Sequence, residues 1–339
     1  RRQRQMCIRD SDWSDAINKA IQNGNHITNY DGSQTYSYED LDKNRDGKID
    51  SITVIYKNTT QNIVINRSDP LWNYKDYADY VEITLADGRM LQSQYYVQVI
   101  NNYSTLYMAN EDRKPIVSLK SPIHEMGHIF GLLDLYNSSG QTPVYFMSAM
   151  ANAISPVPQG LSIKEKEALG WTDPSTLKTI TEPGKYKVKL SGTATGTDDC
   201  IGYKAGIPEL NRTLYLEYRN FSTDGSKYDK SEKQLTNSET SNIKSGLVCY
   251  LAKSDIRFPS NLNGKPGNWV LEVMGGTQST KSDAALGVND SLQVTDKLKV
   301  TVTAIEGDVL TFQIEGEMEQ HVHSLSLIHI SEPTRLQLI

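Results

Sequence analysis

The sequence has few of the features that mark a membrane protein. No run of roughly eighteen apolar residues occurs in its 339 residues, which excludes a membrane-spanning helix. Cysteine is scarce at three residues, so we expect one disulfide at most. Phenylalanine is also rare, with 5 residues against 19 tyrosines. Abundant tyrosine, together with frequent asparagine, serine and threonine, is typical of a β-rich extracytoplasmic protein.

The two ends of the chain look unlike the rest. Residues 1–11 (RRQRQMCIRDS) look like the in-frame translation of a sequencing adapter, and residues 325–339 begin with LSLIHISEPTR, which looks like the opposite adapter. We therefore expect both segments to lie outside the natural protein. Cys7 belongs to the first segment. Cys200 and Cys249 remain, either as one disulfide or as two separately buried thiols.

The chain is acidic. Its formal net charge is −6, from 41 acidic and 35 basic side chains. The first eleven residues hold four arginines against one aspartate, and the last fifteen hold one arginine against one glutamate, so the part between them carries −9. Such a surface is poorly suited to binding nucleic acid or anionic membranes. The length is sufficient for a sizeable core and two domains.

Residues 124–134 (HEMGHIFGLLD) carry the clearest chemical signal. His124 and His128 are four residues apart, so on a helix both imidazoles project from one face, where they can bind zinc. Glu125 lies beside the first ligand, where a carboxylate can take a proton from water that the metal activates. Gly131 tolerates the positive φ that lets a chain leave a helix. Asp134 can then return to the same metal.

Three ligands, one open position and one base are typical of a catalytic zinc site rather than a structural one. The alternative is a buried helix whose histidines are only hydrogen-bonded. Glu165 and Glu167 compete with Asp134 as the third ligand, because another class of zinc peptidase takes that ligand from a later helix. The spacing from Gly131 favours Asp134, and the two glutamates are more simply part of a charged helix face.

Hydrophobic periodicity predicts mixed α and β structure before and around this segment. The expected elements are a helix over residues 12–24 and strands over residues 51–58, 79–87 and 94–100. The last strand is either an edge along which an extended substrate pairs or an ordinary internal strand. The zinc-binding helix is expected to begin near Pro122, with Ser121 as its N-cap.

The pattern after Pro174 is that of an all-β module. A short helix over residues 161–171, with Ser162 as its N-cap, precedes it. The expected strands are separated by turn residues and span residues 185–192, 212–221, 246–253, 268–274, 297–307 and 308–316. Such a series is typical of a β-sandwich. The polar segment 222–245 is expected to be a mobile loop.

The acidic segment at residues 42–50 (DKNRDGKID) suggests a second metal site, with Gly47 at the turn. The residues that match ligand positions of a calcium loop are Asp42, Asn44, Asp46, Lys48 and Asp50. Lys48 would contribute only its main-chain carbonyl, and Thr53 stands where a bidentate glutamate is expected. The segment is therefore either a structural Ca²⁺ site or an Asx-rich turn that leads into a strand.

The segment HEMGHIFGLLDLY, residues 124–136, resembles the zinc helix of the immune inhibitor A family of secreted bacterial metallopeptidases, which are metzincin-like. Met147, in VYFMS, falls where that family has its methionine turn beneath the metal. The segments DLDKNRDGKIDSITVIY, GLSIKEKEALGW, LYLEYRN and SGLVCYL also resemble parts of the family, so the resemblance covers most of residues 35–316. It implies a secreted zinc endopeptidase, usually made with a prosegment and often stabilised by calcium.

The chain departs from that family in two places. The methionine turn usually follows a Trp-Asp pair, whereas Val144, Tyr145 and Phe146 stand here, so Met150 remains an alternative to Met147. Where the family often has a histidine in a strand of the β domain, this chain has Cys249.

Together these features predict an α+β protein, with a zincin/metzincin-like catalytic domain over residues 12–176 and an all-β sandwich-like domain over residues 177–318. The expected function is that of a secreted, monomeric zinc-dependent endopeptidase with catalytic Zn²⁺ and structural Ca²⁺, acting on protein or peptide substrates. Either Tyr136 or Tyr145 could stabilise an oxyanion, or simply pack. Two other functions stay open: a catalytically silent zinc-binding or adhesion module, which the intact Glu125 argues against, and a zinc hydrolase with another substrate.

Overall fold

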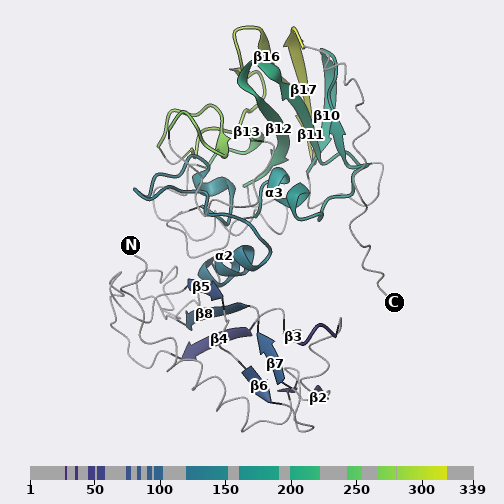
Figure 1. Cartoon of the computed structure of the whole chain (residues 1–339). Coiled ribbons are helices and arrows are strands. Elements are labelled where there is room, and N and C mark those ends of the chain that lie inside the picture. The colour runs from purple at the N-terminus through teal and green to yellow at the C-terminus, as the bar shows by residue number, and fades with distance from the viewer. Residues whose placement is uncertain are drawn as a thin grey trace, which may run out of the picture.

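The computed structural model of the chain is mostly β-sheet with few helices (Figure 1). It describes residues 27–28, 35–36, 45–49, 52–57, 74–77, 82–84, 90–93, 95–101, 120–151, 160–190, 199–221, 243–253, 266–279 and 281–318. The predicted helix over residues 12–24 and most of the predicted loop over residues 222–245 lie outside these ranges, as do residues 1–11 and 325–339.

The first part of the chain forms three small sheets. One has the strand order β4 (Ile52–Lys57), β8 (Tyr95–Asn101), β5 (Tyr74–Tyr77). A second has the order β3 (Lys48–Ile49), β7 (Met90–Ser93), β6 (Glu82–Thr84), and a third pairs β1 (Ile27–Thr28) with β2 (Thr35–Tyr36). The strands predicted over residues 51–58 and 94–100 are thereby confirmed as β4 and β8, and that over residues 79–87 shortens to β6.

The position of β8 decides between the two alternatives that the sequence leaves open for this strand. It pairs in parallel with β4 on one side and antiparallel with β5 on the other. Because both of its edges pair with other strands, β8 is an internal strand over Tyr96 to Gln98 and cannot pair with an extended substrate there. The antiparallel strand β5, which the periodicity did not predict, takes the edge position beside it.

The helix that carries both histidines, α2, spans Lys120–Ile129. It packs against β8 and β5 and lies between this sheet and the β-rich part of the chain (Figure 1). It begins before the predicted start, so Ser121 lies within the helix and is not its N-cap. Pro122 is accommodated because the first turn of a helix needs no main-chain donor.

The β-rich part contains two sheets. The five-stranded sheet has the order β14 (Leu271–Val273), β13 (Gly246–Ala252), β12 (Arg212–Arg219), β11 (Gly202–Ile207), β9 (Leu177–Thr179). The four-stranded sheet has the order β10 (Gly184–Lys189), β17 (Val309–Gly316), β16 (Leu298–Glu306), β15 (Ser291–Gln293). Six of these nine strands were predicted, with β14 shorter than expected, whereas β9, β11 and β15 were not.

Each face of the five-stranded sheet covers its own hydrophobic core. One core lies between the two sheets and includes Leu216 and Cys249 from one and Val300 and Phe312 from the other. All seven residues of β13 are buried because side chains on both faces of this strand are covered.

The second core joins the opposite face of the five-stranded sheet to the segment that follows α2. It includes Leu132, Met147 and Met150 from that segment and Tyr215 and Tyr250 from the sheet. Residues on both sides of the boundary predicted at residues 176 and 177 therefore contribute to one core.

The short helix α3, Ile163–Ala168, packs against β12. Its N-cap is Ser162, as the sequence predicts, in a capping box with Glu165. The helix ends at Leu169, and Gly170 follows with a φ of +70°, the left-handed conformation that favours glycine.

Cys200 and Cys249 are both buried free thiols, so the disulfide alternative is wrong for this structure. No helix among the described residues is long and apolar enough to cross a membrane.

Candidate metal centre

The helix α2 brings the two histidines together. The rings of His124 and His128 meet edge to face, with centroids 4.8 Å apart. His124 Nε2 lies 3.0 Å and His128 Nε2 lies 3.1 Å from the same oxygen, Oδ1 of Asp134. All three side chains are shielded from solvent, with exposed fractions of 11%, 19% and 17% respectively. The three residues that the sequence singled out as ligands thus converge on one point.

Asp134 reaches the histidines because the chain reverses just after the helix. Gly131 has a φ of +91°, which a residue with a Cβ adopts only under strain. The N–H of Gly131 donates to the carbonyl of His128, and that of Leu132 donates to the carbonyl of Gly127. The chain then turns back, and the N–H of Leu135, next to Asp134, donates to the carbonyl of Met150 at 2.8 Å.

Main-chain carbonyls set the orientation of both rings. Nδ1 of His124 lies 3.0 Å from the carbonyl oxygen of Ala149, and Nδ1 of His128 lies 2.9 Å from that of Leu132. A carbonyl oxygen can only accept, so each Nδ1 carries the proton and donates it. In the neutral form of each ring, Nε2 therefore presents a lone pair toward Asp134.

The pKa values of Asp134 and His128 are shifted by their contacts at the centre. Burial alone would lower the pKa of His128, but its hydrogen bond with Asp134, the charges of Asp134 and Glu125, and the Leu132 carbonyl together raise it. Burial alone would raise the pKa of Asp134, but the hydrogen bonds and charges of His124 and His128 hold it well below its usual range. Asp134 is therefore an anion at neutral pH.

These donors fit a zinc ion. Two imidazole nitrogens and one carboxylate oxygen form a known catalytic zinc set. A tetrahedral ion with bonds of about 2.0–2.1 Å separates neighbouring ligand atoms by about 3.3 Å. The observed separations of 3.0 and 3.1 Å are close to that spacing. The Nδ1 hydrogen bonds also match the outer contacts that zinc-binding histidines make in proteins.

Glu125, the predicted general base, is partly buried on the same helix. Its charge contributes to the raised pKa of His128, so its carboxylate lies near that imidazole. Glu125 thus lies on the helix that carries both histidines and is partly exposed to solvent.

The two competing glutamates have partners elsewhere. Glu165 is 1% exposed and accepts hydrogen bonds from the hydroxyls of Ser148 and Ser162. Glu167 accepts from Lys204 and from the hydroxyl of Tyr215, each at 2.7 Å. Neither joins the group formed by the histidines and Asp134.

The structure distinguishes the two methionines beneath α2. Met150 packs directly against Gly127 of the helix, where an added Cβ would overlap its Sδ. Met147 is equally buried and lies in the short 3-10 helix Tyr145–Met147. Its carbonyl oxygen accepts a hydrogen bond from Nη1 of Arg219 at 2.7 Å. The methionine seen in contact with helix α2 is therefore Met150, the alternative to Met147.

Two contacts of this centre have no signal in the sequence. The carbonyls of Ala149 and Leu132 are main-chain groups, which every residue possesses. Tyr136 stacks on His124 with ring centroids 6.1 Å apart. The sequence offers Tyr136 either as an oxyanion stabiliser or as a packing residue, and in the structure its ring packs on that of His124.

Of the possible calcium ligands, Asp42, Asn44 and Asp50 lie outside the described residues. Gly47 has a φ of +81°, as expected for a turn, and Asp46 before it is exposed. Lys48 begins strand β3. The turn and the following strand are thus present, and both the calcium site and the simple Asx-rich turn remain compatible with them.

No family model, no curated protein and no solved structure matches the chain.

Proposed function

We propose that the protein is a zinc-dependent endopeptidase that hydrolyses protein or peptide substrates. One observation carries the proposal: each imidazole donates its Nδ1 proton to a main-chain carbonyl, so that both Nε2 atoms converge on Asp134 Oδ1. With both rings neutral and no cation, the two Nε2 lone pairs and the carboxylate would repel one another, so the contact needs either a proton on Nε2 or a cation between the three atoms. A divalent cation held by His124, His128 and Asp134 relieves that repulsion.

When bound, zinc would supply a Lewis acid that polarises the peptide carbonyl and acidifies water. Glu125 removes a proton from the attacking water, since its carboxylate is partly exposed next to His128. Glu125 then delivers that proton to the leaving amine. His124, His128 and Asp134 keep their positions throughout, because carbonyls and the turn at Gly131 hold them.

A peptide substrate is favoured by the strand next to the helix. Strand β5 is antiparallel to β8 and lies at the edge of its sheet, and among the described residues no strand pairs with its other side. The helix α2 packs against both strands. We propose that an extended peptide adds to the edge of β5 by main-chain hydrogen bonds.

The resemblance to the immune inhibitor A family supports further parts of the proposal. It suggests a metzincin-like catalytic fold with a methionine beneath the metal; we propose Met150 for this role in place of Met147, because Met150 contacts Gly127. It also suggests that the protein is secreted, acts as a monomer and binds structural calcium at residues 42–50. The acidic composition is in keeping with a substrate that is neither nucleic acid nor membrane.

Hydrolysis of casein by the full chain tests the proposal. We expect activity that a zinc chelator abolishes and added zinc restores. Glu125→Gln should reduce the rate by about 10²–10⁴-fold while zinc binding persists, because only the base is lost. Glu209→Gln is the matched control, since Glu209 is exposed on a short turn of the β-rich part. Activity that survives both chelation and Glu125→Gln would contradict the proposal.

A chain that binds zinc with an intact fold but cleaves no peptide bond would instead favour the catalytically silent zinc-binding module. In that case Glu125→Gln would leave every measured property unchanged.

A further inference from the structure

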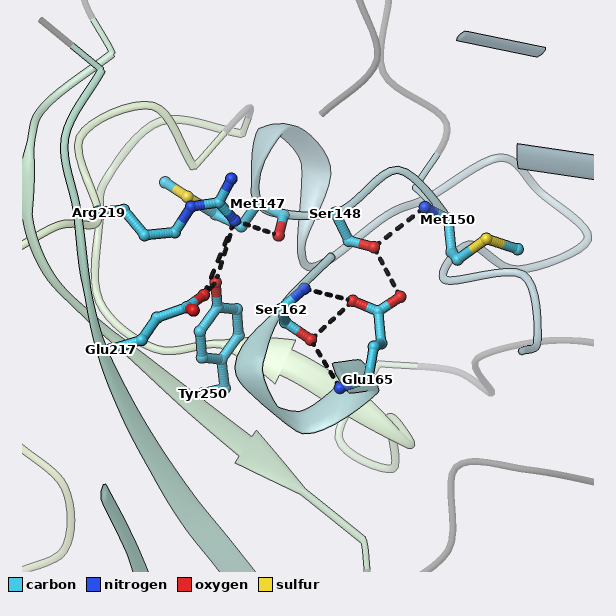
Figure 2. A network of polar contacts seen from close by, with 8 residues as sticks. All are labelled: Met147, Ser148, Met150, Ser162, Glu165, Glu217, Arg219 and Tyr250. Carbon is cyan, nitrogen blue, oxygen red and sulfur yellow. Dashed lines mark hydrogen bonds and ion pairs between the residues drawn. The ribbon is translucent and has the colours of Figure 1, made fainter. Parts of the chain in front are cut away.

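Residues 147–150, which we name the floor loop, are fixed by side chains from two distant elements (Figure 2). The hydroxyl of Ser148 donates to Oε1 of Glu165 at 2.7 Å and accepts from the N–H of Met150 at 3.0 Å. The next residue, Ala149, offers its carbonyl to His124 Nδ1. The loop therefore connects helix α3 to the candidate metal centre through a few covalent bonds.

The α3 side of this connection is a buried carboxylate with a full set of donors. Glu165 is 1% exposed, and its Oε2 accepts from the N–H of Ser162 at 2.7 Å and from its hydroxyl at 2.6 Å. With the Ser148 hydroxyl on Oε1, both oxygens are occupied. A buried carboxylate is retained only where such donors compensate its desolvation, so the Ser148 bond has a strong structural reason to persist.

A second buried group holds the loop from strand β12. Nη1 of Arg219 donates to the carbonyl of Met147 at 2.7 Å and lies 3.7 Å from Oε1 of Glu217. The hydroxyl of Tyr250 donates to that same Glu217 oxygen. Arg219 is 3% exposed, so its charge depends on these partners in place of water.

We propose that Glu165 and Arg219 are positioning residues for the candidate metal centre, which they serve by fixing the floor loop so that the Ala149 carbonyl orients His124. The inference rests on the proposed function. Glu165 holds Ser148 and Arg219 holds Met147, the two residues that directly precede Ala149.

The physical consequence is a dependence of the metal affinity on the β-rich part of the chain. The peptide planes on either side of a residue turn about its φ and ψ, so release of the Ser148 side chain leaves the neighbouring Ala149 carbonyl without one fixed orientation. Without that acceptor, His124 no longer holds one tautomer with Nε2 toward Asp134. Loss of such outer contacts typically weakens metal binding by about 10–100-fold.

The zinc dissociation constant of the full chain, measured by competition with a chromophoric chelator, tests this inference. Ser148→Ala and Glu165→Gln should each weaken zinc binding by about 10–100-fold. Glu167→Gln is the matched control, because Glu167 lies on the same helix but binds Lys204 and Tyr215 instead of the loop. Its zinc affinity should equal that of the wild type. Zinc affinity unchanged in folded Ser148→Ala and Glu165→Gln would overturn the inference while leaving the proposed function intact.

A second measurement needs no metal. In the metal-free chain, the ¹⁵N resonance of His124 should show a proton held on Nδ1, and Ser148→Ala should replace it with a mixture of tautomers. A merely structural role would lower the melting temperature without changing that resonance. If the wild type binds no zinc, the proposed function fails, and the His124 resonance still decides whether the loop positions the ring.

Discussion

Gly127 is a point of close approach between α2 and the floor loop. An ideal Cβ at this position would overlap Sδ of Met150 and lie 3.1 Å from its Cε. Glycine is a poor helix former, and its presence between the two histidines is explained by this contact. The packing of Met150 against Gly127 thereby helps to set the height of the helix above the loop that orients His124.

We predict that Gly127→Ala destabilises the protein despite the higher helix propensity of alanine. Overpacking against Met150 costs about 1–3 kcal/mol, whereas the propensity gain is about 1 kcal/mol at most. Adding Met150→Ala should recover part of the loss, because the two side chains then no longer collide. Urea unfolding of the single and double variants measures both effects. A Gly127→Ala protein more stable than the wild type would show that the contact does not form.

Among the individual residues, the sequence predicted that His124, His128 and Asp134 lie together, because their helical spacing and a glycine that permits positive φ can be read directly from it. It could not predict the Ala149 and Leu132 carbonyls, since main-chain groups have no residue signature. The sequence pattern also could not show that Met150 is the methionine in contact with α2, because that contact depends on how the floor loop packs in three dimensions.

Helix α3 shows how two neighbouring carboxylates on one short element differ in environment. Glu165 faces inward, where burial raises its pKa against the opposing hydrogen bonds of Ser162 and Ser148. Glu167 faces outward, where hydrogen bonds from Lys204, Tyr215 and Lys164 overcome the effect of burial and lower its pKa to about 2. Glu165 thus ties α3 to the floor loop, and Glu167 ties it to the sheet.

The lowered pKa of Glu167 predicts how the stability of the protein changes with pH. Its ionised form is favoured in the folded state, so its contribution is fully present above the unfolded pKa of about 4.3 and is lost as pH falls toward 2. Glu167→Gln should therefore lower the melting temperature at pH 7 and make progressively less difference below pH 5. An effect of the same size at pH 7 and pH 3 would contradict this assignment.

Among the elements, the sequence predicted the long strands β12, β13, β16 and β17, because apolar residues fill or alternate along them. It missed β11, in which Gly202 and Gly206 weaken the strand pattern. Gly202 is needed because a Cβ there would lie 2.8 Å from Cγ1 of Ile163 in α3. The pattern also could not show that β5 pairs beside β8, since strand order depends on tertiary packing.

In the molecule as a whole, the five-stranded sheet has a core on each face. One core lies between it and the four-stranded sheet, and the other includes the floor loop and the segment after α2. The composition and the strand spacing predicted two packed sheets. They did not predict that the sheet would also pack against the segment that follows α2, because the residues involved lie far apart in the sequence, such as Met150 and Tyr250.

The two buried thiols give a prediction for the whole protein. Burial raises the pKa of Cys249 to about 12, so it should be unreactive while the protein is folded. In a Cys7→Ser background, the native chain should show no thiol that reacts with a disulfide reagent at pH 8, and the unreduced denatured chain should show two. A reductant should leave the melting temperature unchanged. Absence of free thiols after denaturation would mean that Cys200 and Cys249 are bonded.

His124, His128 and Asp134 are proposed to hold one metal ion. Equilibrium dialysis of the full chain against zinc measures that binding. We predict that the wild-type chain binds one zinc ion. Binding should be abolished in His128→Ala and weakened in Asp134→Asn, whereas Glu209→Gln should bind zinc as the wild type does. A folded wild-type chain that takes up no zinc, or a His128→Ala chain that retains it, would contradict the account.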